Sequence, residues 1–170
     1  DKAWKAYLPH AGKAVDVNSV LPDGGRLLPS GTNVMFDNRT HWMTDAEGGN
    51  YRVFAIDGSD AQRGDATGEN MIERYCTGNF LAGQRLIYAS ASGLPVGRYV
   101  FKAVVQKGAD GGVIELFAND DRSPVTSVKV LRETEVATDV LDQDLTVGVE
   151  SGLNNACQWV SFADVALEYQ

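Results

Sequence analysis

The chain has 170 residues, of which 44% are hydrophobic and 22% are charged, and its formal net charge is −8. This composition is that of one globular domain of ordinary size and excludes a disordered polar tail. The negative charge disfavours nucleic acid and anionic membranes as partners, and no apolar run approaches the roughly 20 residues of a transmembrane helix. The first seven residues contain no signal-peptide core, so we expect either a cytosolic protein or one whose signal was removed before residue 1.

The first half of the chain predicts short strands in a region rich in Gly, Asn and Asp. Strand candidates lie at 13–17, 33–36 and 51–56, and a further strand lies at 85–91. Residues 65–75 are the only candidate for a helical turn.

The second half predicts strands with one buried side. Residues 98–106 alternate apolar and polar side chains, and a loop then returns the chain into 113–118, which suggests a hairpin. Further strands are predicted at 125–130, 145–149 and 159–169. The side chains that this alternation places in the core are Tyr99, Phe101, Val105, Leu145, Val147, Val165 and Leu167.

Many short strands separated by turn signals, with almost no helical periodicity, predict an all-β fold. An antiparallel sandwich or barrel fits this pattern. The sequence contains no repeat, low-complexity tract or linker, so a single domain is expected over residues 1–170.

Catalytic motifs are absent from the sequence. His10 and His41 stand in no metal-ligand motif, and there is neither a nucleophile elbow nor a phosphate-binding glycine loop. The 23 acidic residues can still meet in pairs that sequence does not identify. The tripeptide at 63–65 matches an integrin-recognition signal that arises often by chance, and we interpret it as an ordinary polar loop.

Cys76 and Cys157 are too few for a disulfide scaffold and lack the spacing of metal ligands. One bridge in an exported protein and two separate buried thiols both fit the sequence. The thiols are slightly preferred, because free cysteine packs well as a small apolar group.

Aromatic residues beside polar groups are the candidates for ligand contact. Sugars stack their C–H faces on aromatic rings and bond their hydroxyls to polar side chains. Trp159 shares its strand parity with Val165 and is assigned to the core, whereas Trp42 lies in a polar, Gly-rich segment and is a candidate for an exposed platform. The predicted ligand-binding residues are Trp42, Arg74, Tyr75, Asn119 and Asp120.

The second half of the chain also carries an ordered set of motifs. These are NMIERYCT (70–77), LPVGRY (94–99), ELFAND (115–120), LTVGV (145–149) and QWVSFADVAL (158–167). Together they resemble the galactose-binding-like jelly-roll modules of secreted and cell-surface proteins of Bacteroidetes, which are often appended to glycoside hydrolases. The resemblance covers about residues 70–170, and residues 1–69 match nothing in it.

Two positions depart from the pattern of these modules. Tyr75-Cys76 stands where a Trp is common, and Ala163-Asp164-Val165 replaces the usual Asp-Asn-Phe.

The resemblance implies a two-sheet jelly-roll sandwich and a non-catalytic role near carbohydrate. It also implies export, so that the protein is secreted, periplasmic or on the surface of a bacterium. Whether the chain is one domain of a larger multidomain protein stays open. The resemblance names no sugar. Two alternatives stay open: a structural or protein-adhesion sandwich without a sugar site, and a sandwich-fold carbohydrate-active enzyme.

The resemblance further implies a structural calcium ion where the first and last strands meet. Calcium binds six to eight hard oxygen ligands. Asp164 would share a strand face with Val160 and Phe162, where a lone carboxylate is costly. Asp16 and Asn18 on the opening strand are the candidates to complete the site. Exposure of Asp164 at a sheet edge, or an ion pair with arginine, is the alternative.

Overall fold

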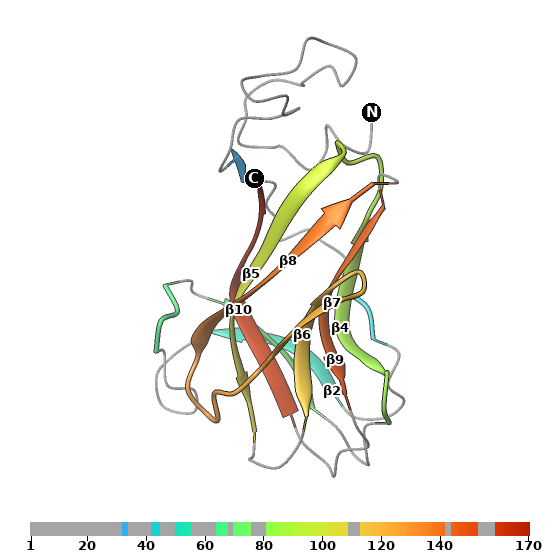
Figure 1. Cartoon of the computed structure of the whole chain (residues 1–170). Helices are drawn as coiled ribbons and strands as arrows, with labels where there is room; N and C mark the ends of the chain where they lie inside the picture. The colour runs from blue at the N-terminus through green and yellow to red at the C-terminus, as the bar shows by residue number, and fades with distance from the viewer. Residues whose placement is uncertain are drawn as a thin grey trace.

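A computed structural model gives the structure of the protein (Figure 1). It describes residues 32–33, 42–44, 50–55, 64–67, 70–75, 81–108, 113–141, 144–152 and 159–170. The strands of these segments are β1 (Thr32–Asn33), β2 (Asn50–Ala55), β3 (Asn70–Tyr75), β4 (Arg85–Ala91), β5 (Gly97–Lys107), β6 (Ile114–Ala118), β7 (Asp121–Pro124), β8 (Arg132–Val140), β9 (Leu145–Ser151) and β10 (Trp159–Tyr169).

The strands form two antiparallel sheets that pack face to face, which is the predicted sandwich (Figure 1). The six-stranded sheet has the order β2-β3-β10-β5-β8, and β1 pairs with β10 outside this path. The four-stranded sheet has the order β4-β9-β6-β7. The last strand, β10, therefore lies inside its sheet rather than at an edge, and the fold is completed only by the end of the chain.

Several expected elements differ in the structure. Residues 70–75 form a strand and not a helical turn, and 113–118 is not the hairpin partner of 98–106, because β5 and β6 belong to different sheets. The tight hairpin is instead β6–β7. Residues 125–130 make only isolated bridges, and the regular strand is β8. The sequence analysis did not predict β8, because this edge strand carries charged side chains over much of its length. The strand predicted at 13–17 lies outside the described residues.

The core between the sheets confirms six of the seven predicted residues. Tyr99, Phe101, Val105, Leu145, Val147 and Leu167 are at most 1% exposed. The seventh, Val165, is half-buried and packs against the margin of the same core. Alternation along a strand therefore identified the buried faces wherever the strand is regular.

β10 is irregular in its middle. Ala163 pairs with Val104 and Ala166 with Lys102, so β10 has one more residue than β5 between these pairs. The extra residue makes a β-bulge, and Asp164 within it has a left-handed backbone with φ of 50°.

The bulge reverses which side chains of β10 face the core. Before it, Val160 and Phe162 lie in the core between the sheets; after it, Leu167 and Tyr169 do. Ala163 instead joins a small apolar cluster on the outer face of the six-stranded sheet, the face turned away from the other sheet, with Ala66, Met71, Val104 and Leu131. The predicted single face from Trp159 to Tyr169 is therefore wrong, because one inserted residue exchanges the two faces of a strand.

Candidate functional site

The outer face of the four-stranded sheet carries a polar surface. Along β9, Leu145, Val147 and Val149 point into the core, so Thr146, Gly148 and Glu150 point outward. The register of the neighbouring strands places the following outward side chains beside them: Arg85, Tyr88 and Ser90 on β4, and Phe117 on β6 with Arg122 opposite it on β7.

Gly148 occupies the middle of this surface, between Tyr88 and Phe117. A Cβ atom at Gly148 would lie 2.0 Å from the carbonyl oxygen of Ile87, so no side chain fits there without moving the backbone. The centre of the face is therefore without a side chain of its own.

A hollow of about 350 Å³ lies over this centre. Its lining residues are Arg85, Phe117, Asn119, Asp120, Arg122, Asp144, Thr146 and Glu150. We call it the outer-face hollow. It reaches both sides of Gly148 along β9, because the outward neighbours of that glycine, Thr146 and Glu150, both line it.

Asn119 organises the hairpin end of the outer-face hollow. Its side-chain amide donates to the carbonyl oxygen of Asp144 at 3.1 Å and accepts from the backbone N–H of Thr146 at 2.9 Å, while its own N–H donates to the Thr146 carbonyl at 2.8 Å. Asn119 has φ of 50°, a left-handed conformation that asparagine tolerates in turns. The hairpin is thereby tied to the start of β9, and the neighbouring Asp120 is exposed at the rim.

An ion pair crosses the hollow. Arg122 on β7 binds the carboxylate of Glu150 on β9, so its side chain must pass over β6, which lies between these strands. Arg122 also donates to the carbonyl of Asn119 at 3.3 Å. Phe117 on β6 is the cross-strand partner of Arg122. Its side chain is only 3% exposed and forms an apolar floor of the hollow.

Next to the hollow, on β4, an aromatic ring has a cation over it. The guanidinium carbon of Arg85 lies 4.0 Å from the centre of the Tyr88 ring, a cation–π contact. Next along β4, the Ser90 hydroxyl is hydrogen-bonded to that of Thr146 at 2.9 Å. The face therefore offers flat groups, hydroxyls, guanidiniums and carboxylates together, which is the chemistry that binds polyhydroxylated molecules.

Two of the predicted ligand contacts, Asn119 and Asp120, line this hollow, whereas Trp42 and Arg74 lie elsewhere. Trp42 is half-buried against the core, and its ring centre is 4.9 Å from that of Phe162 in an edge-to-face contact. Its segment pairs with β4 through Met43 and Tyr88. Trp42 therefore does not form the open platform that its polar neighbourhood suggested.

Arg74 is 2% exposed, and its Nε donates to the Thr44 hydroxyl at 3.2 Å. Burial lowers the pKa of its guanidinium below the usual value. The predicted contact of Arg74 with a ligand is therefore corrected: this side chain is not accessible. The backbone of Tyr75 ends β3, and its side chain lies outside the described residues, as do Cys76 and Cys157.

A second hollow, of about 280 Å³, lies on the outer face of the six-stranded sheet beside Asp164. The Asp164 carboxylate accepts hydrogen bonds from the backbone N–H and the hydroxyl of Thr67, the latter at 3.0 Å. Lys102 forms an ion pair with Glu168 at 3.1 Å, and that bond raises the pKa of the lysine.

The calcium prediction concerns Asp164, Asp16 and Asn18. Asp16 and Asn18 lie outside the described residues. Within the described segments, no three His, Cys, Asp or Glu side chains are grouped so as to hold a metal ion. The Asp164 carboxylate accepts two hydrogen bonds from Thr67, which offset the cost of its partial burial. Its position therefore does not by itself require a cation.

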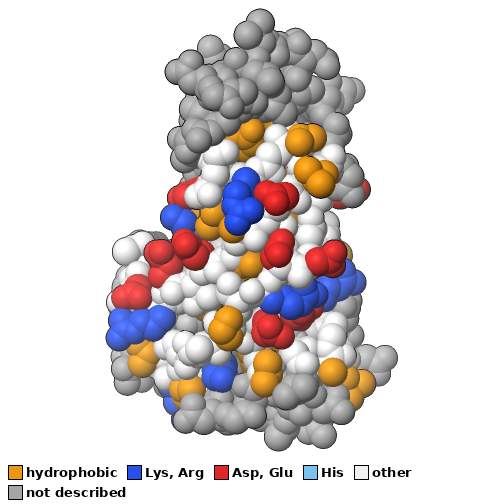
Figure 2. Space-filling view, in the orientation of Figure 1, with side chains coloured by type: hydrophobic (Ala, Val, Ile, Leu, Met, Phe, Trp, Pro, Cys, Tyr) orange, Lys and Arg blue, Asp and Glu red, His pale blue; other side chains and the backbone are white. Residues whose placement is uncertain are grey.

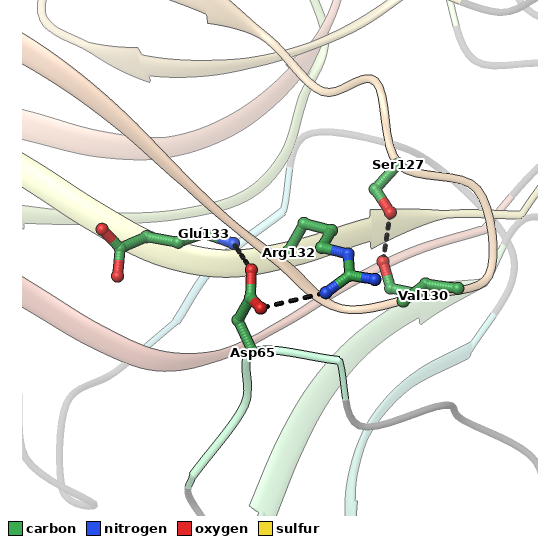
Figure 3. Close-up of polar contacts among 5 residues, drawn as sticks. All are labelled: Asp65, Ser127, Val130, Arg132 and Glu133. Carbon is green, nitrogen blue, oxygen red and sulfur yellow. Dashed lines mark hydrogen bonds and ion pairs between the residues drawn. The ribbon is translucent and has the colours of Figure 1, made fainter.

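Of the tripeptide at 63–65, which we interpreted as a polar loop, the structure describes the last two residues, Gly64 and Asp65. The Asp65 carboxylate forms an ion pair with Arg132 at 3.0 Å and accepts the backbone N–H of Glu133 at 3.2 Å (Figure 3). A Cβ at Gly64 would lie 1.9 Å from the carbonyl oxygen of Leu131. This segment is thus anchored against the start of β8, and Arg63 lies outside the described residues.

Sequence reasoning missed most residues of the outer-face hollow, including Arg85, Phe117, Arg122 and Glu150. The alternation of residues 145–149 contained a usable signal, because it marks Thr146 and Gly148 as outward. Which residues lie beside them depends on the strand order β4-β9-β6-β7, which sequence alone does not provide.

Comparisons with solved structures identify the same architecture. The CBM22-1 xylan-binding domain of Paenibacillus barcinonensis Xyn10C matches with a TM-score of 0.54 and 11% identity, over 82% of this chain and 96% of that one. The TmCBM61 module in complex with β-1,4-galactotriose matches with a TM-score of 0.51 and 17% identity, over 78% and 90%. A Bacteroides thetaiotaomicron VPI-5482 structure, proposed to be a sugar binding protein, matches with a TM-score of 0.51 and 13% identity, over 76% and 88%.

These likenesses show the fold: a β-sandwich shared with carbohydrate-binding modules. The chain spans only 26% of a Clostridium thermocellum xylanase structure that holds CBM22-1 and GH10 modules, at a TM-score of 0.47. No family model and no curated protein matches the sequence. Among the described residues, no helix has the length and apolar character needed to span a membrane.

Proposed function

We propose that this chain is a non-catalytic carbohydrate-binding module and that the glycan lies in the outer-face hollow. The observation that carries the proposal is the hollow itself, in which the Phe117 floor and Arg85 stand beside hydrogen-bonding side chains, with the Tyr88 ring next to the hollow under Arg85. Such a surface gives a sugar ring both an apolar contact and partners for its hydroxyls. The shared fold of the xylan-binding and galactotriose-binding modules supports the same function.

We further propose that the module works outside a bacterial cell, as one part of a larger protein. The motif resemblance to exported modules supports this location. The similar structure from Bacteroides thetaiotaomicron is consistent with it. The net charge of −8 also fits a partner without phosphate groups.

A glycan-array screen of the purified chain, followed by calorimetric titration of the best oligosaccharide, tests the function. Affinity is expected near the millimolar range, on the order of −4 kcal/mol. Arg85→Ala and Thr146→Val should each weaken binding by about fivefold to tenfold, because each removes a polar contact at the hollow.

The matched control is Arg98→Ala, which removes an exposed arginine of the other sheet and should bind as the parent does. Thermal unfolding of each variant separates lost binding from lost folding. If no glycan binds the parent chain, the proposed function is wrong. If the Arg85 and Thr146 variants both bind like the control, the glycan site lies elsewhere.

A further inference from the structure

We propose, resting on the proposed function, that the outer-face hollow selects neutral glycans and discriminates against anionic ones such as uronate-bearing chains. The charges that line the hollow and the partners of its two arginines carry this inference.

The hollow contains more negative than positive side chains. Three carboxylates line it, from Asp120, Asp144 and Glu150, against the two guanidiniums of Arg85 and Arg122. One negative charge is therefore in excess at the site, on a chain whose net charge is already −8. An anionic sugar would approach a surface of its own sign.

Both guanidiniums are already engaged by the protein. Arg122 is bound to Glu150 and donates to the carbonyl of Asn119, and Arg85 lies over the Tyr88 ring. A sugar carboxylate would have to displace Glu150 to form a bidentate pair with Arg122, which would leave that largely buried carboxylate without its partner.

The two remaining carboxylates lie at the hairpin end of the hollow. Asp120 and Asp144 are both exposed, and Asn119 ties their segments together by donating to the Asp144 carbonyl. Exposed carboxylates accept hydrogen bonds from neutral sugar hydroxyls, so the same groups that favour a neutral ring repel an ionised one. Figure 2 shows the wider pattern on the face it displays, where acidic and basic side chains lie next to one another rather than in a basic patch.

The experiment compares matched sugars that differ in charge. Neutral gluco- and galacto-oligosaccharides and their counterparts with the primary hydroxyls oxidised to carboxylates are titrated into the full chain at low and high salt. The neutral member should bind about fivefold or more tightly at low salt, and the difference should narrow at high salt because ions screen the repulsion.

Charge variants locate the effect. The double variant Asp120→Asn, Asp144→Asn should raise the affinity for the oxidised sugar, relative to the neutral one, by about fivefold. The double variant Glu135→Gln, Asp139→Asn is the matched control, since it likewise removes two exposed carboxylates, from β8 of the other sheet, and should leave the ratio unchanged.

The outcomes separate the two proposals. Tighter binding of the oxidised sugar that weakens with salt overturns the selectivity and leaves carbohydrate binding in place. If the control on β8 changes the ratio of the affinities for the oxidised and the neutral sugar as much as the hollow variant does, the selectivity is also overturned. The effect would then come from net charge and not from the hollow. If neither sugar of any pair binds the parent, the proposed function itself fails and the selectivity falls with it.

Discussion

Phe101 illustrates how a single residue stabilises the sandwich. It is fully buried on the core face of β5, which pairs with both β10 and β8 in the six-stranded sheet. Truncation there removes a large apolar side chain and leaves a cavity that rigid sheets on either side cannot readily fill.

Phe101→Ala is therefore expected to lower the free energy of unfolding by about 3–5 kcal/mol. Chemical denaturation measures the loss, and Arg98→Ala, at an exposed position of the same strand, should change stability by no more than about 0.5 kcal/mol. A denaturation midpoint that stays at the parent value in Phe101→Ala would contradict the core position.

Trp42 and Arg74 show at the same scale why local composition misleads. Their neighbours in the sequence are polar, yet the burial of each comes from residues distant in the chain. Trp42 is 120 positions from Phe162, against which its ring packs, and Arg74 reaches Thr44 across 30 positions. A residue's exposure follows from such tertiary contacts, which a polar or apolar neighbourhood in the sequence does not encode.

At the scale of elements, the bulge of β10 depends on Asp164. The left-handed φ of 50° is unfavourable for most side chains and acceptable for Asp, Asn and Gly. The carboxylate also holds the segment at Thr67 through two hydrogen bonds. Backbone conformation and side-chain bonding thus act together at one position.

Three variants separate these contributions. Asp164→Ala should cost about 1–3 kcal/mol, since it loses the bonds to Thr67 and keeps a Cβ at positive φ. Asp164→Gly should recover part of the loss by relieving the backbone, and Asp164→Asn should be the mildest because it retains an acceptor. Thermal or urea unfolding gives the order; a glycine variant less stable than the alanine variant would show that backbone strain is not important here.

At the scale of the whole molecule, the outer-face hollow exists because four strands from different parts of the sequence lie in one sheet. β4 begins at residue 85 and β9 ends at residue 151, yet Arg85 and Glu150 are direct cross-strand partners. The ion pair of Arg122 and Glu150 then joins β7, at one edge of this sheet, to β9 on the far side of β6.

The predicted calcium site at Asp164, with Asp16 and Asn18, also concerns the whole fold, because it would join the two ends of the chain. A cation bound only by the folded state stabilises it by mass action. A strong chelator is therefore expected to lower the melting temperature of the parent chain and to have no effect on Asp164→Ala. An unchanged melting temperature of the parent would eliminate the calcium site and leave the Thr67 bonds as the compensation that the described residues provide for Asp164.

The fold class and six of the seven predicted core residues could be read from the sequence, because both follow from short-range alternation. Tyr99, Phe101 and Val105 lie two or four residues apart on one strand, and strand geometry alone puts them on one face. Asn119 and Asp120 stay a prediction as ligand contacts, and the structure adds that both line the outer-face hollow.

The pairing of the strands, the bulge and the composition of the outer-face hollow become known only from the folded chain. β5 and β6 follow each other in the chain but belong to different sheets, so the expected hairpin failed. One extra residue near Asp164 exchanged the faces of β10. The physical reason is common to all three: register and sheet order are set by contacts between residues far apart in the chain, whereas alternation reports only on a residue's immediate neighbours.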